Sequence, residues 1–286
     1  MMDSVALVKH EGDLNETLER AIRLIGGLKT LKSTLIVKPN ICTGVDETGL
    51  ANTDVKLVDT FIGLVLKQNR NLSIKIVESD SEAKYADEAF QKFGYRDLEQ
   101  RLRNSGFDVS LVNLSHSALV PVRLDGLYLK NPDLPSLLAE DKYFVSMAVA
   151  KTHGLTFITG TMKNLFGLLP RKGKSYYHPH INEVIVDLNK FVKPDLSIID
   201  ARQGLEGWAG PRTRLVNRLI LGRNPASVDA TMARVMGFKP ESIRHLVEAE
   251  RNGIGSLHPN VLGDDPKLAA VKFNKPSRLS PAALVE

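Results

Sequence analysis

Short apolar runs that alternate with longer amphipathic segments limit the possible folds of this chain more than any other feature. β-Branched and aliphatic runs bounded by turn-forming residues predict strands, whereas apolar residues spaced three and four apart predict helices. The predicted strands are 33–38, 72–78, 108–113, 143–149 and 196–200, with 215–221 as a candidate sixth. The predicted helices are 14–25, 98–103, 55–67, 182–192, 226–236 and 241–251.

Strands that alternate with helices in this way form βαβ units and a mainly parallel sheet. The strands lack regular polar alternation, which fits a sheet covered by helices on both faces. We therefore expect a three-layer α/β fold, either as one body or as two lobes with a cleft at the carboxyl ends of the strands. Residues 1–272 are expected to form a single α/β domain and 273–286 a loosely held tail, while 114–141 predicts a small subdomain or an edge hairpin.

The composition is ordinary for a soluble globular protein, with 286 residues, 43% hydrophobic and 25% charged. The single cysteine, Cys42, excludes a disulfide within the chain and a protein-held iron–sulfur cluster, and it favours a reducing compartment. The first residues lack a secretory signal, and no apolar run reaches the length of a membrane-spanning helix. We expect a cytosolic protein without a membrane partner.

Two stretches without acidic residues stand out in a chain that has 33 of them. One runs from Lys142 to Asn182, and the other, which carries four arginines, runs from Gly207 to Val228. One-sided positive charge favours an anionic ligand, although a solvated basic face is the alternative interpretation. The net charge of +5 also permits nucleic acid, but with 6% aromatic residues and no aromatic residues interleaved in basic runs, that partner is disfavoured.

The ends of the predicted strands carry polar side chains. In open α/β sheets, ligands bind beyond the carboxyl ends of the strands. Lys38 and Asn40 follow one strand, Lys151 and His153 follow another, and Asp200 ends a third. We expect these ends to converge on one crevice, with Lys38, Asn40 and Lys151 among the residues that bind the ligand.

The segment Thr159-Gly160-Thr161-Met162-Lys163-Asn164 is the strongest candidate for chemistry. It is not a Walker A motif, but a Thr-Gly turn before a helix start can present backbone N–H groups to an anion. Neighbouring cations would lower the pKa of Lys163 and make it a candidate nucleophile or general base, with a solvated or salt-bridged lysine as the alternative. His153, with an ordinary imidazole pKa, suits proton transfer at neutral pH. We predict Lys163 and His153 as catalytic, with Thr159, Gly160 and Asn164 orienting the ligand.

Further candidates are more ambiguous. Arg171 opens a basic loop that is either a phosphate-attracting lid or a solvated turn. His178 and His180 have a spacing that a metal site can use, and unliganded loop histidines are the alternative. The acidic candidates, as ligand contacts, acid partners or metal ligands, are Asp200, Glu206 and Asp229.

Taken together, these strings resemble the motifs of the domain of unknown function 362 family. The matching strings are Lys38-Pro-Asn40, Lys151-Thr-His153, Thr159-Gly-x-x-Lys163-Asn164-x-x-Gly167, Glu206-Gly207 with Gly210-Pro211, Asn224-Pro-x-x-Val228-Asp229 and Met236-Gly237-Phe238. They cover almost the whole chain in the family's order. Members often carry a ferredoxin-like cluster segment or accompany redox proteins, and a chain with one cysteine lacks that segment.

A more distant resemblance is to the nickel-pincer lactate racemase family. His153 and Lys163 have the family's spacing between a histidine and a lysine in a glycine turn. The resemblance implies that Lys163 holds a nicotinate-derived cofactor through a thioamide, that His153 transfers protons and that His178 or His180 binds nickel. The turn departs from the family's Gly-Gly and Pro-Gly pattern, so shared architecture and a shared lysine turn are implied more strongly than a shared cofactor.

These observations predict an enzyme that binds a small phosphate- or carboxylate-bearing substrate or a nucleotide-like cofactor. Isomerisation or racemisation is the reaction that the resemblance favours. A non-catalytic protein for binding or maturing an anionic metabolite or cofactor is one alternative, and a redox accessory protein is another. The sequence leaves the substrate and the oligomeric state open.

Overall fold

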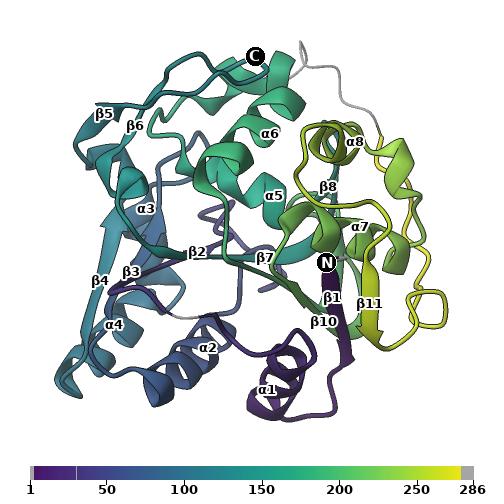
Figure 1. The fold of residues 1–286 in the computed structure, drawn as a ribbon, viewed down its shortest axis with the longest axis horizontal. Coiled ribbons are helices and arrows are strands. Elements are labelled where there is room, and N and C mark those ends of the chain that lie inside the picture. Colours follow the sequence, from purple (N-terminus) through teal and green to yellow (C-terminus); the bar gives the residue numbers. More distant parts are fainter. Residues whose placement is uncertain (1–2, 30, 278–286) are drawn as a thin grey trace.

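The computed structural model describes residues 3–29 and 31–277. Within these ranges, nine strands form one mixed sheet with helices on both faces (Figure 1). The strand order is β11-β1-β10-β9-β7-β2-β3-β4, with β8 paired to β7. The sheet is therefore continuous across the molecule, and the predicted α/β class is confirmed.

The elements follow one another along the chain as predicted, with additions. The strands of the large sheet are β1 (Ser4–Lys9), β2 (Thr34–Pro39), β3 (Ser73–Glu78), β4 (Asp108–Asn113), β7 (Tyr143–His153), β8 (Phe157–Thr159), β9 (Leu196–Glu206), β10 (Arg212–Gly222) and β11 (Asn260–Gly263). The helices are α1 (Leu14–Leu24), α2 (Val55–Gln68), α3 (Ala86–Lys92), α4 (Tyr95–Asn104), α5 (Thr161–Asn164), α6 (Ile181–Val192), α7 (Pro225–Val235) and α8 (Arg244–Arg251). The sequence patterns did not predict β1, β8, β11 or α3.

The pairing is mostly parallel. β2 pairs parallel with β3 and β7, β3 with β4, β7 with β9, and β1 with β11. β10 runs antiparallel to β9 and β1 because β9 continues to Glu206 and returns through a five-residue loop, 207–211. The prediction had ended this strand near Asp200, so the β9–β10 hairpin was not anticipated.

Each face of the sheet has its own apolar core. Leu35 and Val37 of β2 point into the core formed with α1, α2, α3 and α4, whereas Ile36 between them points into the core formed with α5 to α8. This alternation follows from the two-residue period of a strand, and it explains why the buried strands are apolar throughout. The predicted three-layer arrangement is confirmed (Figure 1).

Segment 114–141 holds a small two-stranded sheet of β5 (Leu119–Pro121) and β6 (Asp133–Pro135). The carboxylate of Asp187 on α6 fastens its tip by accepting from the backbone N–H groups of Leu127, Tyr128 and Leu129 at 2.5, 2.8 and 2.8 Å. A buried carboxylate that satisfies three amides fixes this segment against the helical layer.

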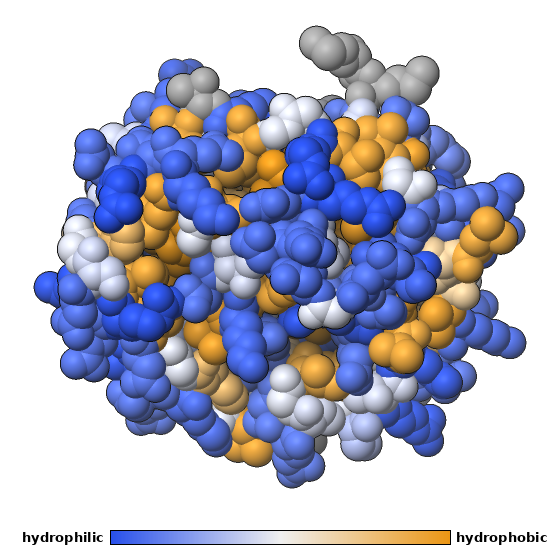
Figure 2. Space-filling view, turned by 90° about the horizontal axis from the view of Figure 1, so that it is seen from below, coloured by the Kyte–Doolittle hydropathy of each residue, from blue (hydrophilic) through white to orange (hydrophobic). Residues whose placement is uncertain are grey.

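The final described residues pack against the end of α7 and against β9. Phe273 is buried, and Asn274 donates from its backbone N–H to Glu206 at 2.9 Å. Of the tail predicted from residue 273, positions 278–286 lie outside the described residues. None of the described helices combines the length and apolarity needed to cross a membrane, and the face seen from below is covered mainly by hydrophilic residues (Figure 2).

Candidate functional site

A cavity of about 340 Å³ lies beyond the carboxyl ends of β2, β3 and β7. Of the strand ends predicted to converge, those of β2 and β7 meet here, together with the end of β3, whereas Asp200 of β9 does not line this cavity. Five lysines and two glutamates line it: Lys38, Lys84, Lys151, Lys163, Lys174, Glu78 and Glu82. Apolar and aromatic side chains complete the wall: Ile41, Leu155, Phe166 and Trp208.

Lys38 and Glu78 form a buried ion pair at the ends of β2 and β3. The Nζ of Lys38 lies 2.6 Å from Oε2 of Glu78, and both side chains are at most 2% exposed. Burial tends to raise the pKa of Glu78, but Lys38 and Lys84 outweigh it and hold that pKa below its usual value. Lys38 also donates to the carbonyl of Pro39 at 2.6 Å. Its amine is therefore fully engaged by protein oxygens.

Lys151 is also engaged. Its fully buried amine donates to Oδ1 of Asn40 at 2.6 Å and to the carbonyl of Ala51 at 2.7 Å, and it lies 3.3 Å from the Sγ of Cys42. Asn40 thus orients the lysine across the gap between β2 and β7. This lysine gives the cavity wall positive charge without offering a free donor.

Lys174 enters the cavity from a short 3₁₀ segment, Lys174–His180. Its Nζ donates to Oγ of Ser79 at 2.9 Å and to the carbonyl of Asp80. Burial lowers the pKa of Lys174 to about 8, although Glu78 acts in the opposite direction. Lys84 similarly donates to the carbonyl of Ser79 and lies 3.6 Å from Glu78.

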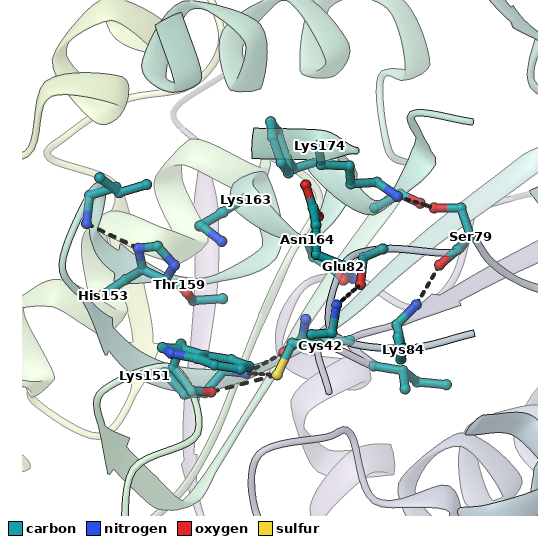
Figure 3. A pocket seen from close by; sticks show the side chains of 18 of the residues that line it. Cys42, Ser79, Glu82, Lys84, Lys151, His153, Thr159, Lys163, Asn164 and Lys174 are labelled. Carbon is teal, nitrogen blue, oxygen red and sulfur yellow. Dashed lines mark hydrogen bonds between the residues drawn. The ribbon is translucent and has the colours of Figure 1, made fainter. Parts of the chain in front are cut away.

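Lys163, on the four-residue helix α5, differs from the other cavity lysines. Among the described residues its amine has no hydrogen-bond acceptor and no carboxylate within ion-pair distance, and its nearest recorded partner is the ring of Phe166 at 5.9 Å. Burial and then the charge of Lys151 lower the pKa of Lys163 to about 8. Figure 3 shows this amine pointing into open space between His153, Thr159 and Asn164.

Asp229 of α7 holds the turn that carries Lys163. Its carboxylate accepts from the N–H and Oγ1 of Thr161, both at 2.7 Å, and from the N–H of Met162 at 3.0 Å. A Cβ at Gly160 would lie 2.5 Å from this carboxylate, so the glycine makes room for it. The backbone N–H groups that were expected to bind a ligand anion therefore donate to the carboxylate of Asp229 instead. Gly160 and Asp229 therefore position the turn and do not themselves contact a ligand. Burial raises the pKa of Asp229 to about 6.

Asn164 fixes the other side of the same turn. Its Nδ2 donates to the carbonyl of Lys38 at 2.8 Å and to Oγ of Ser146 at 3.1 Å, and its Oδ1 accepts from Lys38 at 3.3 Å. These contacts join α5 to β2 and β7. Asn164 lines the cavity, but its hydrogen bonds position the backbone of Lys163.

His153 lies at the end of β7 and lines the cavity beside Lys163. Its Nδ1 accepts from the N–H of Leu155 at 3.2 Å, so the neutral ring carries its proton on Nε2. Burial, followed by the charges of Lys163 and Lys151, holds the pKa of His153 well below 6.5. The expectation of an ordinary imidazole pKa differs from this finding, since the cations around the ring disfavour its protonated form. His153 is a neutral donor at pH 7.

Two further polar atoms of cavity residues lack partners among the described residues. These are Oγ1 of Thr159 and Nδ1 of His178, both buried. His178 stacks against Phe166, and burial lowers its pKa, with Lys163 adding to the effect. Because buried polar groups are normally hydrogen-bonded, unsatisfied atoms beside an unpaired amine indicate a place for a ligand.

Several predicted site residues lie elsewhere. Asp200 pairs with Arg202 at 2.6 Å on the far side of β9, and Glu206 pairs with Arg214 at 2.8 Å. His180 is exposed and stacks on Tyr128 outside the cavity, and Arg171 stacks on Tyr176. The structure therefore does not bring His178, His180 and Asp200 together. No cluster of three or more His, Cys, Asp or Glu suited to a metal occurs in the described parts of the chain.

The second acid-free stretch does not face the cavity either. Arg214 pairs with Glu206, Arg218 with Asp264 at 2.7 Å, and Arg223 donates to the carbonyl of Gly27 at 2.8 Å. Carboxylates outside the run therefore pair with two of its four arginines, Arg214 and Arg218.

Among the residues of the cavity, Glu82, Lys84 and Trp208 were not predicted as site residues, whereas Lys174 belongs to the basic loop that was predicted as either a lid or a solvated turn. Trp208 had a usable signal, since the only tryptophan of the chain lies in a glycine-rich loop after a predicted strand. Glu82 and Lys84 follow β3 by a few residues and had none beyond that position.

Fold and site together define an α/β protein with a lysine-lined cavity at the carboxyl edge of its sheet. Residues 35–234 match the model of the family described as Domain of unknown function (DUF362). The match covers most of the chain, and the protein belongs to this family.

Two individual proteins are similar over parts of their length. A stretch of 120 residues is 28% identical to the thylakoid-associated protein sll1697 of Synechocystis sp., covering 38% of this chain and 37% of that protein. The lactate racemase apoprotein of Thermoanaerobacterium thermosaccharolyticum aligns with a TM-score of 0.46 and 13% identity, over 79% of this chain and 55% of that one. The chain thus spans little more than a third of the first relative and about half of the second.

Proposed function

We propose that the cavity binds a small carboxylate- or phosphate-bearing molecule and that the protein is an enzyme acting on it. The observation that carries this proposal is the state of Lys163, an amine in a cavity with no protein partner among the described residues, next to unsatisfied atoms of Thr159 and His178. This amine is reached from the cavity, and with no counter-charge recorded among the described residues it can take an anionic ligand as its partner.

The charge of the cavity supports an anion. Five lysines outnumber two glutamates among the lining residues, and Glu78 is already neutralised by Lys38. The apolar side chains of the wall lower the local polarity, which strengthens the attraction between the remaining positive charge and a ligand. An anion bound here would also raise the low pKa of His153, because an opposite charge stabilises the imidazolium.

For the reaction we propose a proton transfer at carbon, as in isomerisation or racemisation. Such a reaction needs a base near neutrality and a donor that stabilises developing negative charge. Lys163, with a pKa of about 8, provides the base in its neutral fraction. His153 donates from Nε2 to an oxygen of the substrate, and Thr159 orients the bound group.

A nickel-pincer cofactor is a finer hypothesis for the same cavity. Lys163 has the free amine to hold a nicotinate-derived group, and Nδ1 of His178 is an unsatisfied imidazole nitrogen in the same wall. These two groups would hold the cofactor, and the nickel would supply the reactive centre when bound. His178, rather than the outward-facing His180, is the ligand we propose.

The test is native mass spectrometry with elemental analysis of freshly purified protein, followed by thermal shift with a panel of carboxylates and phosphates. We expect an anion to raise the melting temperature of the wild type and of Lys172→Met, whose lysine stacks on Tyr85 outside the cavity. We expect Lys163→Met to lose about tenfold in affinity, as for one charged contact. Equal affinity in both variants would refute the site. An adduct on Lys163 or stoichiometric nickel would support the cofactor hypothesis.

A non-catalytic binding or maturation protein is the second candidate, favoured by the neutral state of His153, which leaves no strong acid beside the ligand. It predicts a copurifying ligand without turnover. A redox accessory role predicts a chromophore or bound iron in the same samples. For location we propose the cytosol, supported by the single cysteine, Cys42, which is a free thiol.

A further inference from the structure

The cavity contains two lysines with similarly lowered pKa values but opposite surroundings. Burial lowers the pKa of both Lys163 and Lys174 to about 8. Lys174 donates to Ser79 and Asp80, so its protons are held by two oxygens. Lys163 has no such acceptor among the described residues, and its amine points into the cavity (Figure 3).

An amine whose task is only to hold an anion gains from staying charged. The environment of Lys163 works against that, because burial and the nearby Lys151 both disfavour the ammonium form. At pH 7 a lysine with a pKa of about 8 has a neutral fraction on the order of 300-fold larger than an unshifted lysine. This is the state in which lysine attacks carbonyl carbon.

We propose that Lys163 forms an imine with the carbonyl group of a 2-oxo acid, whose carboxylate is held by the positive wall of the cavity. This inference rests on the proposed function, since it names the substrate class and the bond formed at the same site. In the step, the amine nitrogen bonds to the carbonyl carbon, and the carbon–oxygen bond breaks. Both amine protons leave with that oxygen as water, so no oxidant or reductant is needed.

Neighbouring groups suit each part of this step. The neutral ring of His153 donates from Nε2 to the carbonyl oxygen and polarises it, as its Nδ1 is occupied by Leu155. The lysines of the cavity wall attract the carboxylate, and Thr159 lies in the same wall. The apolar side chains of Leu155 and Phe166 line the same cavity, and low polarity there favours the loss of water from the reacting carbon.

An imine would also serve the proposed proton transfer. Its nitrogen, once protonated, withdraws electrons from the adjacent carbon and makes the neighbouring proton more acidic. The proton next to the former carbonyl would then pass to water in the cavity and return from it, because the nitrogen of Lys163 is engaged in the imine and cannot act as the base.

The experiment is reductive trapping on the full chain with pyruvate and sodium cyanoborohydride, followed by peptide mass spectrometry. We expect one adduct, on Lys163, with at least about tenfold less on Lys174, because Ser79 and Asp80 fix the amine of Lys174 whereas the amine of Lys163 points into the cavity. Yield should rise between pH 6 and 8, as the amine deprotonates. Propionate, which has a carboxylate but no carbonyl, should compete and leave no adduct.

Lys163→Arg separates binding from covalent chemistry, since arginine keeps the charge and loses the nucleophile. We expect this variant to melt like the wild type and to retain stabilisation by pyruvate, with no adduct. Labelling of lysines in proportion to their exposure would overturn the imine. If trapping fails but pyruvate still stabilises the wild type more than Lys163→Met, the imine falls and the anion site stands. If pyruvate and the rest of the anion panel neither label nor stabilise the wild type, both fall.

Discussion

The two ends of the cavity carry basic groups in opposite states. At the paired end, Lys38, Lys84 and Lys174 are held by Glu78 and by oxygens of residues 79 and 80. At the open end, Lys163 and His178 keep atoms without protein partners among the described residues. The same residue type therefore serves as framework at one end and as a candidate reactive group at the other.

The difference follows from the cost of burying charge. Taking an ammonium out of water costs several kcal/mol, and an ion pair with added hydrogen bonds offsets this only when its geometry is good. The paired end meets that condition. At the open end no ion pair with Lys163 is recorded among the described residues, and burial lowers the pKa of Lys163. Counting lysines would have given both ends equal weight.

The paired end should be the more sensitive to substitution. We expect Glu78→Gln to lower the free energy of unfolding by about 3–5 kcal/mol, because Lys38 would be left as a buried charge without its carboxylate. Urea denaturation measures this directly. Asp141→Asn, which removes an exposed pair with Lys32, is the matched control and should change stability by less than about 0.5 kcal/mol. Similar losses in the two variants would remove the distinction between framework and surface pairs.

Asp229 tests the support beneath the open end. We expect Asp229→Asn to cost about 2–3 kcal/mol, because an amide has one acceptor oxygen for the three donors that Thr161 and Met162 present. The variant should also lose anion binding, since the turn positions Lys163. Thermal unfolding with and without ligand measures both effects. Unchanged binding in a destabilised variant would show that the turn does not depend on this carboxylate.

How much of this could be predicted depends on the range of the interactions. Helix α1 has its signals within a few residues: Asp13 caps it, and Leu18 and Ile22 are buried at helical spacing. The placement of Lys38 and Lys151 at one sheet edge follows from the rule that the carboxyl ends of parallel strands lie at the same edge, and Lys163 follows Lys151 closely in sequence. These parts needed only local patterns.

The state of each candidate residue depended on partners far away in sequence. Asp229 and Thr161 are 68 residues apart, and Lys38 and Asn164 are 126 apart. No local pattern reveals that the carboxylate of Asp229 accepts from the backbone N–H groups that a ligand was expected to occupy. The antiparallel return of β10 was missed for a similar reason, since its register is set by pairing with β1 and β9.

Behind the open end lies His245, fully buried on α8, with both ring nitrogens unpartnered among the described residues. Burial, with a contribution from Lys163, lowers its pKa to about 3. The unfolded chain takes up this proton below about 6.5 and the folded protein only near 3, so stability falls as the pH drops through that window, by up to about 1.4 kcal/mol per pH unit. Asp229, with a raised pKa of about 6, contributes the opposite slope between 3.8 and 6.

The difference in the free energy of unfolding between His245→Leu and the wild type isolates the contribution of His245 from that of Asp229. We expect the variant to retain more stability than the wild type at pH 4.5, and the gap to close above pH 6.5. Urea denaturation at a series of pH values gives this difference. A gap that does not change with pH would mean that His245 is not kept neutral by the fold.

The smallest effect on stability should come from the residue with the largest proposed role. We expect Lys163→Met to change the free energy of unfolding by less than about 0.5 kcal/mol or to raise it, because the lost amine makes no hydrogen bond and the methionine adds apolar contact with Phe166. Lys174→Met, which leaves Ser79 and the carbonyl of Asp80 without a donor, should cost about 1–3 kcal/mol. Denaturation of both variants compares two lysines of equal pKa and opposite surroundings. If Lys163→Met proved the more destabilising, the open end would be framework as well, and the case for a ligand there would lose its physical basis.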